Sequence, residues 1–246
     1  MIEARQLVKV FHGHKRGTVR AVDGVSFIAR PGRILGLLGA NGAGKTTTLR
    51  MIATLLTPTA GTAIVAGHDV QEEPQIVREK IGFLTGSTAL YGRLTAREMV
   101  EYFGRLHGLD GSRLDARLNE VFSELEMESF ADGRCDKLST GQKQRVSIAR
   151  AIVHRPEVMI FDEPTTGLDV MTSRTIMRFI EKCRAEGRTV VFSTHIMSEV
   201  ERLCDEIAVV HEGRVVASGT VDELRARTGL SALESVFLQL VGESHT

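Results

Sequence analysis

Short apolar runs alternate along the chain with longer segments in which apolar residues recur at helical spacing. The main apolar runs fall at residues 34–38, 81–84, 158–161, 189–193 and 207–210. A run of about four to eight apolar residues is typical of a strand buried on both faces of a parallel sheet. Because amphipathic segments separate these runs, the pattern predicts an α/β fold in which helices cover both faces of a parallel sheet.

The first of these runs leads into a glycine-rich segment and then into a helical pattern. Leu49, Ile52, Ala53 and Leu56 recur at i, i+3, i+4 and i+7. This spacing predicts a helix with one buried face. Between strand and helix, residues 39–46 read G-A-N-G-A-G-K-T and match the phosphate-binding pattern G-x-x-x-x-G-K-[ST] at every fixed position. A glycine-rich turn that merely precedes a helix is the weaker interpretation in this strand-loop-helix context.

Phosphate-binding chemistry follows from the residue types in this loop. Glycines allow backbone conformations closed to residues with a Cβ, so successive N–H groups can point at one anion. The helix N-terminus adds about half a positive charge at the same place. Lys45 supplies a full charge for the β- and γ-phosphates, and the Thr46 hydroxyl is placed to ligate Mg²⁺. The residues predicted to bind a nucleoside triphosphate here are Gly39, Asn41, Gly42, Ala43, Gly44, Lys45, Thr46 and Thr47.

The segments on either side of a loop rich in Gly, Lys and Arg near the N-terminus carry alternating or β-branched apolar residues. We predict that residues 4–11 and 21–28 form two antiparallel strands and that residues 62–70 add another short one. Phe11 ends the first strand, where its ring either stacks on a nucleobase or belongs to an ordinary core.

Two other groups of potential ligands occur. His12 and His14 form an H-x-H that could bind a metal ion, but no third ligand is nearby and a solvated loop is favoured. The three cysteines, Cys135, Cys183 and Cys204, are far apart and include no C-x-x-C pair, so we expect reduced thiols.

A helical tract begins near residue 95, where Thr95 and Glu98 form a capping box. Helical spacing continues to about residue 155, interrupted at Gly108 and Gly111, which predicts a mainly helical subdomain. The apolar residues predicted to share one face of its first helix are Met99, Tyr102, Phe103 and Leu106.

Within this tract, residues 138–142 read L-S-T-G-Q and lead into another helix. Ser139 and Gly141 therefore stand at a helix N-terminus, where backbone N–H groups can hold phosphate. The alternative is a serine helix cap, which these five residues taken alone favour.

Polar residues follow two apolar strands farther along the chain. The run at residues 158–161 ends in Asp162 and Glu163, and an acidic residue at the tip of a buried strand is costly without a cation partner. Asp162 is therefore placed to hold or support Mg²⁺, and Glu163 to orient and deprotonate the attacking water. His195 stands at the C-terminal end of the next strand, where ligands collect in open α/β sheets. We interpret it as a contact to the γ-phosphate or the attacking water rather than as a structural histidine.

The last part of the chain is helical. Thr220 and Glu223 form a second capping box. We predict that the tail helix docks on the domain or on a second copy of the chain. Its apolar residues at helical spacing are Leu233, Val236, Phe237, Leu240 and Val241.

Composition limits the classes of partner. The 246 residues include 31 basic and 31 acidic side chains, so the formal net charge is +0 and no global field favours nucleic acid or an anionic membrane. No apolar run approaches the roughly 18 residues that span a bilayer, and no signal peptide opens the chain. We expect a cytosolic protein, or one that sits on a membrane by binding another protein.

Taken together, these motifs resemble those of the ATP-binding subunits of ABC transporters. They occur in that family's order and cover nearly the whole chain: the phosphate loop at residues 39–46, L-S-T-G-Q at 138–142, M-I-F-D-E-P at 159–164, G-L-D at 167–169 and finally His195. The resemblance implies a P-loop (RecA-like) nucleotide-binding α/β core with an N-terminal antiparallel β subdomain and a helical subdomain that carries the L-S-T-G-Q signature.

The resemblance also implies how a single ABC ATPase domain over residues 1–246 is divided. Residues 1–94 and 156–219 would form the α/β core and the β subdomain. Residues 95–155 would form the helical subdomain, and residues 220–246 a C-terminal helical tail.

Roles for individual residues follow from the same resemblance. Phe11 falls at the adenine-stacking position, and Asp169 of the G-L-D motif belongs to the nucleotide-binding set. Two copies would form a head-to-tail homodimer around two ATP molecules, in which Ser139 and Gly141 of one copy contact the γ-phosphate held by Lys45 of the other. The implied activity is ATP hydrolysis, with ATP and Mg²⁺ as cofactors. It would power a separate integral-membrane permease at the cytoplasmic face of the cell membrane.

Two positions depart from the family pattern. Thr140 replaces the first of the signature's two glycines, whereas Gly141 keeps the second. Gly86 stands where the family usually places a glutamine that touches Mg²⁺ and relays to the membrane subunit. The sequence leaves open whether Thr85 or Ser87 supplies an oxygen there instead.

The tail after Gly219 resembles the exporter branch of the family, which includes pumps for drugs, sodium or polysaccharide, so we expect a sodium or drug exporter. An alternative from another class is a soluble ABC-type ATPase in DNA repair or translation. Such proteins resemble tandem units or cores split by long coiled coils, and the balanced charge gives no sign of nucleic-acid binding. A third hypothesis, a nucleotide-dependent regulatory module without turnover, is opposed by Glu163.

Overall fold

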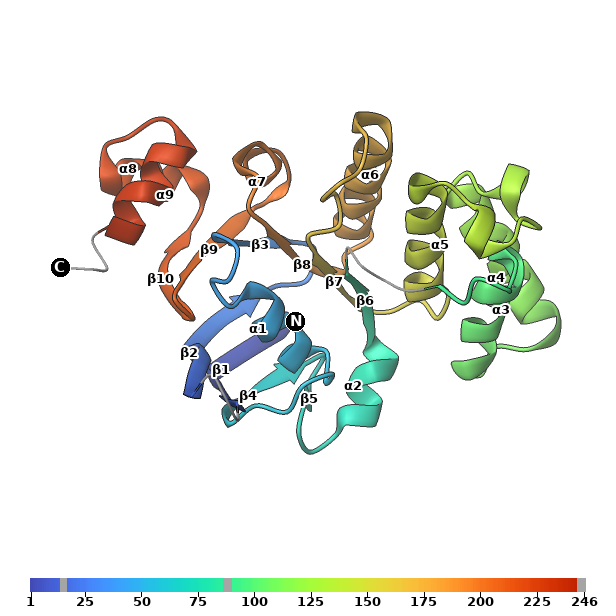
Figure 1. The fold of residues 1–246 in the computed structure, drawn as a ribbon, viewed down its shortest axis with the longest axis horizontal. Coiled ribbons are helices and arrows are strands. Elements are labelled where there is room, and N and C mark those ends of the chain that lie inside the picture. Colours follow the sequence, from blue (N-terminus) through green and yellow to red (C-terminus); the bar gives the residue numbers. More distant parts are fainter. Residues whose placement is uncertain (14–16, 86–89, 243–246) are drawn as a thin grey trace.

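The computed structural model describes residues 1–13, 17–85 and 90–242. In this part of the chain the strands form two sheets, one of six strands and one of four. The smaller sheet and helix α1 (Lys45–Ile52) pack on one face of the larger sheet, and the other face is covered by longer helices (Figure 1).

The larger sheet is the frame on which the polar strand ends are arranged. Its strands are β3 (Ile34–Leu38), β6 (Ile81–Thr85), β7 (Val158–Asp162), β8 (Thr189–Thr194), β9 (Glu206–His211) and β10 (Arg214–Gly219). They follow the order β10-β9-β3-β8-β7-β6, and every neighbouring pair is parallel except β9 and β10. Strands β3, β7 and β8 are buried along their whole length, as their apolar runs predict. Because Leu38 pairs with Thr194 and Asp162 with Ser193, the carboxyl ends of these three strands meet.

The smaller sheet is antiparallel throughout and has the order β2-β1-β4-β5. Its strands are β1 (Ile2–Gly13), β2 (Gly17–Ala29), β4 (Ala60–Val65) and β5 (His68–Asp69). The strands predicted at residues 4–11 and 21–28 are confirmed, and they are longer than predicted because their pairing continues to Gly13 and Gly17. The single strand predicted at residues 62–70 is instead two antiparallel strands, β4 and β5, because the backbone turns at Ala66 and Gly67, which both have positive φ.

Helices fill the predicted tract after residue 95 and flank the larger sheet. Besides α1, the helices are α2 (Pro74–Lys80), α3 (Ala96–Leu106), α4 (Gly111–Glu124), α5 (Thr140–Ile152), α6 (Val170–Ala185), α7 (Met197–Leu203), α8 (Val221–Thr228) and α9 (Leu233–Gly242), with short 3-10 turns at Glu128–Phe130 and Cys135–Lys137. Both capping boxes are confirmed: Thr95 and Glu98 cap α3, and Thr220 and Glu223 cap α8.

Alternate residues of the central strands face different cores. Leu35 and Ile160 pack with α1 and the smaller sheet, whereas Ile34, Phe161 and Phe192 pack with α6 and the helical tract. This alternation explains why the strands read as continuous apolar runs, since both of their faces are covered.

Two helical predictions are wrong in detail. The pattern after the phosphate loop extends to Leu56, but α1 ends at Ile52 because Thr54 takes a left-handed conformation with φ of 59°. In α3 the buried face runs through Ala96, Met99, Val100 and Gly104, whereas Tyr102 and Leu106 are exposed. Tyr102 and Leu106 each follow a buried residue by two positions, which turns them roughly 200° around the helix and onto the surface although they are apolar.

The C-terminal segment docks on the domain, as one of the two predicted alternatives states. It forms two helices, α8 and α9, and Leu233, Val236 and Leu240 of α9 share a buried cluster with Leu38 of β3 and Val200 of α7. The three cysteines are free, and no helix in the described residues is long and apolar enough to cross a bilayer.

Candidate functional site

The phosphate loop joins β3 to α1 and depends on its glycines in two different ways. Gly42 and Gly44 have φ values of 83° and 103°, in the left-handed region that favours glycine. Gly39 has no such φ; there a Cβ would lie only 2.4 Å from the carbonyl oxygen of Val210 in β9. The prediction that all three glycines are needed for unusual backbone conformations is therefore wrong for Gly39, which is required by close packing instead.

Lys45 is the first residue of α1, and its side chain is 3% exposed. Its Nζ donates to the carbonyl oxygens of Gly39 (2.7 Å) and Ala40 (3.1 Å), and it lies 3.4 Å from Oε1 of Glu163. The ammonium group is thus held beneath the loop, beside the backbone that would surround an anion, and one carboxylate balances its charge.

Asp162 ends β7 and is 5% exposed. Its Oδ1 accepts hydrogen bonds from Thr46 Oγ1 (3.0 Å) and Ser193 Oγ (2.7 Å). No Lys or Arg forms an ion pair with this carboxylate in the described part of the chain. A buried carboxylate beside a hydroxyl, with no cation of its own, is the donor set that Mg²⁺ prefers.

Glu163 follows directly and has a φ of 49°, which is unusual for a residue with a Cβ. Its backbone N–H is fixed by the carbonyl and hydroxyl oxygens of Ser193, both at 3.1 Å. Its Oε1 lies 3.5 Å from Nδ1 of His195. The structure therefore brings together Glu163, His195 and Lys45, which are far apart in the sequence.

Ser193 belongs to this cluster but is absent from the predicted set. It lies inside an apolar strand, and its hydroxyl donates to Asp162 while accepting from the N–H of Glu163. Ser193 could have been found from the sequence as a hydroxyl residue near the end of a buried strand, because burying a polar group without a hydrogen-bond partner is costly.

The L-S-T-G-Q segment lies elsewhere in the fold. Ser139 caps α5 in a capping box with Gln142, so the cap interpretation describes its contacts within this chain. A Cβ on Gly141 would lie 2.6 Å from Thr172 Oγ1 of α6, which makes the start of α5 a close packing point. Asp169 caps α6 by accepting from the N–H (2.9 Å) and hydroxyl (2.7 Å) of Thr172, and these hydrogen bonds hold the pKa of its carboxyl below the usual range.

Within the described residues, no hydrogen bond or ion pair joins Ser139, Gly141 or Asp169 to the phosphate loop. Figure 1 shows that α5, which Ser139 and Gly141 begin, lies with the helices on the far side of β6 from α1. The site that a single chain assembles therefore contains the phosphate loop and the strand ends, but not the L-S-T-G-Q segment.

The remaining candidates lie near the surface. Phe11 is 42% exposed, with Lys9 Nζ 5.4 Å from its ring centre, so it is not an ordinary core aromatic. Asn41 is exposed and Thr47 partly buried, and Ala43 is buried in the loop. His12 contacts Thr18 at 3.3 Å.

Other sequence candidates cannot be placed fully. His14, Gly86 and Ser87 lie outside the described residues. Thr85 ends β6 and pairs in register with Asp162. No group of three or more His, Cys, Asp or Glu side chains forms a metal-binding cluster in residues 1–13, 17–85 and 90–242.

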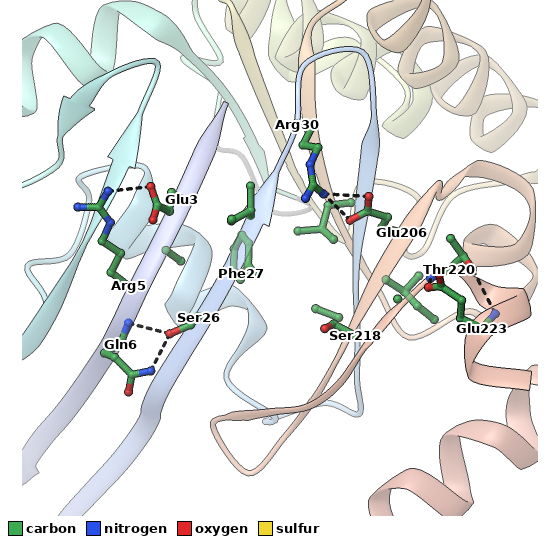
Figure 2. A pocket seen from close by; sticks show the side chains of 16 residues that line it. Glu3, Arg5, Gln6, Ser26, Phe27, Arg30, Glu206, Ser218, Thr220 and Glu223 are labelled. Atoms are coloured by element: carbon green, nitrogen blue, oxygen red, sulfur yellow. Dashed lines mark hydrogen bonds and ion pairs between the residues drawn. The ribbon is translucent and has the colours of Figure 1, made fainter. Parts of the chain in front are cut away.

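A separate cavity of about 730 Å³ lies between strands β1 and β2 and strands β9 and β10 (Figure 2). The charged side chains that line it already have partners within the chain: Glu3 with Arg5, Arg30 with Glu206, and Glu223 with the N–H of Thr220. None of the predicted site residues lines it, so it does not compete with the phosphate loop as the functional site.

Comparison with known proteins agrees with this geometry. A family model described as "ABC transporter" matches residues 22–166, and one described as "AAA domain, putative AbiEii toxin, Type IV TA system" matches residues 134–201. The chain is 42% identical to the ABC transporter ATP-binding protein NatA of Bacillus subtilis (strain 168), over 91% of this chain and 92% of NatA.

Two other relatives carry names linked to drugs. The daunorubicin/doxorubicin resistance ATP-binding protein DrrA of Streptomyces peucetius is 39% identical, over 94% of this chain and 69% of DrrA. The probable multidrug ABC transporter ATP-binding protein YbhF of Escherichia coli (strain K12) is 37% identical over 98% of this chain, which spans only 42% of YbhF.

Solved structures share the fold over nearly the whole chain. "Structure of ATP binding subunit of ABC transporter" is similar with a TM-score of 0.86 and 29% identity, covering 98% of this chain and 99% of that one. The ATP-binding cassette MJ0796, in a dimeric post-hydrolysis state bound to ADP and Pi, has a TM-score of 0.82 and 29% identity, covering 90% of this chain and 99% of that one. The chain thus belongs to the ABC transporter family, as one of its ATP-binding and ATP-hydrolysing subunits.

Proposed function

We propose that this ATPase drives a separate membrane permease from the cytoplasmic face of the membrane and exports sodium ions or a drug. The observation that carries the proposal is the joining of Lys45, Glu163 and His195 at one end of the sheet, next to Asp162 and Thr46. A pure binding module has no need of a carboxylate held at φ of 49° between a lysine and a histidine.

The proposed roles follow the geometry. Lys45 and the loop N–H groups from Gly39 to Thr47 hold the phosphates, and the exposed ring of Phe11 stacks on adenine. Glu163 orients and deprotonates the attacking water, and His195 contacts the γ-phosphate or that water. In this scheme the α/β core of residues 1–94 and 156–219 holds ATP, and the helical subdomain of residues 95–155 presents the L-S-T-G-Q segment.

We assign a Mg²⁺ site to Thr46 and Asp162. The fit rests on the buried Asp162 carboxylate, which has two hydroxyl partners and no ion-paired Lys or Arg among the described residues. Mg²⁺ held there would offset negative charge on the β- and γ-phosphates. Asp162→Asn should weaken the Mg²⁺ dependence of nucleotide binding, measured by titrating Mg²⁺ against a fluorescent ATP analogue, while binding of nucleotide without Mg²⁺ changes little.

The L-S-T-G-Q segment fits a homodimer in which each ATP lies between two chains. Ser139, Gly141 and Asp169 would then complete the site formed around Lys45 of the other copy. The support is that α5 begins far from the phosphate loop of its own chain, together with the dimeric solved structure of a relative. Because separated chains would each hold half a site, ATP binding would shift the population toward the closed dimer.

The surface that we propose for the permease lies between α3 and the end of α1. Four apolar side chains are exposed there, and we name them the apolar patch: Leu55, Tyr91, Tyr102 and Leu106. Tyr102 stacks edge-on against Tyr91 and Phe103, and a cavity of about 320 Å³ lined by Leu55, Phe83 and Phe103 continues the patch. Adjoining exposed apolar groups of this kind mark protein interaction sites.

Substitution within the patch tests this docking. Tyr102→Glu should abolish co-purification of the chain with its permease from detergent-solubilised membranes, because a charge would be buried at the interface. Leu238→Glu, at an exposed position of α9, is the matched control and should leave co-purification unchanged. ATP binding should be normal in both variants, and equal capture of permease by both would overturn this docking surface.

Transport itself distinguishes the two cargo classes. Inside-out vesicles that contain the chain and its permease should take up either sodium or a fluorescent drug when ATP is added, and Glu163→Gln should abolish uptake while ATP still binds. The alternative, a soluble ATPase in DNA repair or translation, predicts no association with membrane protein and turnover that responds to nucleic acid.

A further inference from the structure

Glu199 lies in α7, and its side chain is 4% exposed. No Lys or Arg forms an ion pair with it in the described part of the chain. A carboxylate buried in this way is costly unless strong hydrogen bonds replace the lost water. Its neighbours in the helix, Glu201 and Arg202, are exposed and form surface ion pairs, so the burial of Glu199 is a specific feature of its position.

Each carboxylate oxygen of Glu199 accepts a hydrogen bond from one hydroxyl group, one in the loop after β7 and the other at the end of β8, where the next loop begins. Thr165 Oγ1 donates to Oε1 at 2.6 Å, and Thr194 Oγ1 donates to Oε2 at 2.6 Å. Both threonines are themselves buried. Short O–H···O⁻ hydrogen bonds are among the stronger ones in proteins, so Glu199 links the two loops firmly.

The two linked loops are the ones that carry the proposed catalytic pair. Thr165 lies two residues after Glu163, and the loop between them is closed by the N–H of Thr166 donating to the carbonyl of Glu163 at 3.3 Å. Thr194 directly precedes His195, and its hydroxyl also accepts from the N–H of Ile196 at 3.0 Å, which fixes the turn around the histidine. Glu199 therefore holds the backbone on both sides of the 3.5 Å approach between Glu163 and His195.

We propose that Glu199 is a positioning residue for ATP hydrolysis: by bridging Thr165 and Thr194 it sets the separation of Glu163 and His195 without touching the nucleotide. This inference rests on the proposed roles of Glu163 and His195. Displacement of a catalytic group by about 1 Å can cost on the order of 100-fold in rate, so the bridge affects turnover much more than binding.

The test compares steady-state ATPase kinetics of Glu199→Leu, Glu199→Gln and the control Glu201→Leu. Glu199→Leu should lower kcat about 10- to 100-fold, with the KM for ATP and the binding of a fluorescent ATP analogue changed less than about threefold. Glu199→Gln should recover most of the rate, because its amide can still bond both hydroxyls. Glu201→Leu, in the same helix but exposed, should behave as the parent protein.

A double-mutant cycle with His195→Ala separates positioning from general stability. If Glu199 acts through the Glu163 and His195 pair, Glu199→Leu should add little to the loss already caused by His195→Ala. Rate losses that multiply, a kcat within twofold of the parent, or a KM that rises as kcat falls would each overturn the proposal.

Two further variants keep the test decisive. If Glu199→Leu does not fold, Thr165→Val and Thr194→Val each remove one end of the bridge, and the same loss of kcat at constant KM is expected from both; normal kcat in both overturns the proposal. Failure of the proposed function is a different result, because Glu163→Gln would then keep its turnover whatever the Glu199 variants do.

Discussion

The end of the sheet that carries the phosphate loop and the start of α5 are built in opposite ways. At the first, the start of α1 and the ends of β7 and β8 are joined within one chain: Lys45 contacts Glu163, Thr46 donates to Asp162, and Glu163 donates to Ser193. At the second, Ser139 is exposed and forms its capping hydrogen bonds with Gln142 of the helix that it begins, while Gly141 packs against α6. One region is thus completed within the chain, and we name it the completed region. The other is the region that we propose a second chain completes, and we name it the prepared surface.

The largest change in nucleotide binding should come from removing the Lys45 ammonium group of the completed region. Lys45→Ala takes away a buried ammonium that contacts two loop carbonyls and Glu163, and nucleotide affinity should fall at least about 100-fold because a full positive charge beside the phosphates is lost. Equilibrium binding of a fluorescent ATP analogue measures it. Lys80→Ala, which removes an ion pair with Glu157 at the other end of β6, is the control and should bind normally.

Mixing two inactive variants should test the comparison most directly. Lys45→Ala disrupts the completed region and Ser139→Arg disrupts the prepared surface. A dimer made only of one variant should therefore have no ATPase activity. In a mixed dimer both lesions fall in one site and the other is intact, and a 1:1 mixture should regain up to about a quarter of the parent ATPase rate. A mixture as inactive as its components would show that the L-S-T-G-Q segment does not act on the neighbouring chain.

Acid should lower the stability of the folded protein through His154, which lies just after α5. The His154 ring stacks on His107 with centres 3.7 Å apart, and burial, reinforced by the nearby His107, lowers its pKa from 6.5 to about 4. Because the folded protein keeps this ring neutral, the unfolded chain binds the extra proton between those pH values. The free energy of unfolding should therefore fall as the pH drops from 6.5 toward 4, by about 2 kcal/mol.

Urea unfolding at pH 7 and pH 4.5 measures that loss. His154→Gln should remove most of the pH dependence, whereas His12→Gln, at an exposed position of β1, should retain it. The same pH slope in both variants would contradict the assignment to His154.

The smallest effect uses the capping boxes of α5 and α8 as matched sites. Ser139→Ala and Thr220→Ala each remove a side chain that accepts a helix N–H, and each should cost about 1 kcal/mol of stability in thermal or urea unfolding. Only Ser139→Ala should also lower the ATPase rate. Equal rates in the two variants would mean that Ser139 is a helix cap and nothing more.

The strand ends could be predicted from the sequence because a short apolar run followed by an acidic or glycine-rich segment has few structural interpretations. Asp162 and Glu163 were identifiable in this way. Glu199 was not, because M-S-E-V-E-R-L reads as an ordinary helix with charged residues, and only the fold shows which glutamate is buried. The end of α1 was not predicted for a related reason. Apolar periodicity shows which residues could share a helical face, but it does not show that the backbone leaves the helix at Thr54.

Glycine positions show the same limit. The phosphate-binding motif requires glycine at position 39. The structure gives the physical reason: a Cβ there would collide with the carbonyl oxygen of Val210, about 170 residues away in the chain, and local sequence cannot reveal that contact.

The left-handed backbone at Glu163 has a practical consequence for protein engineering. Glycine and asparagine adopt such a conformation with less steric conflict than glutamate, so a search for heat-resistant variants by local backbone preference would select this residue for replacement. One of the positions that such a search would relax is therefore the carboxylate that we propose as the base in ATP hydrolysis.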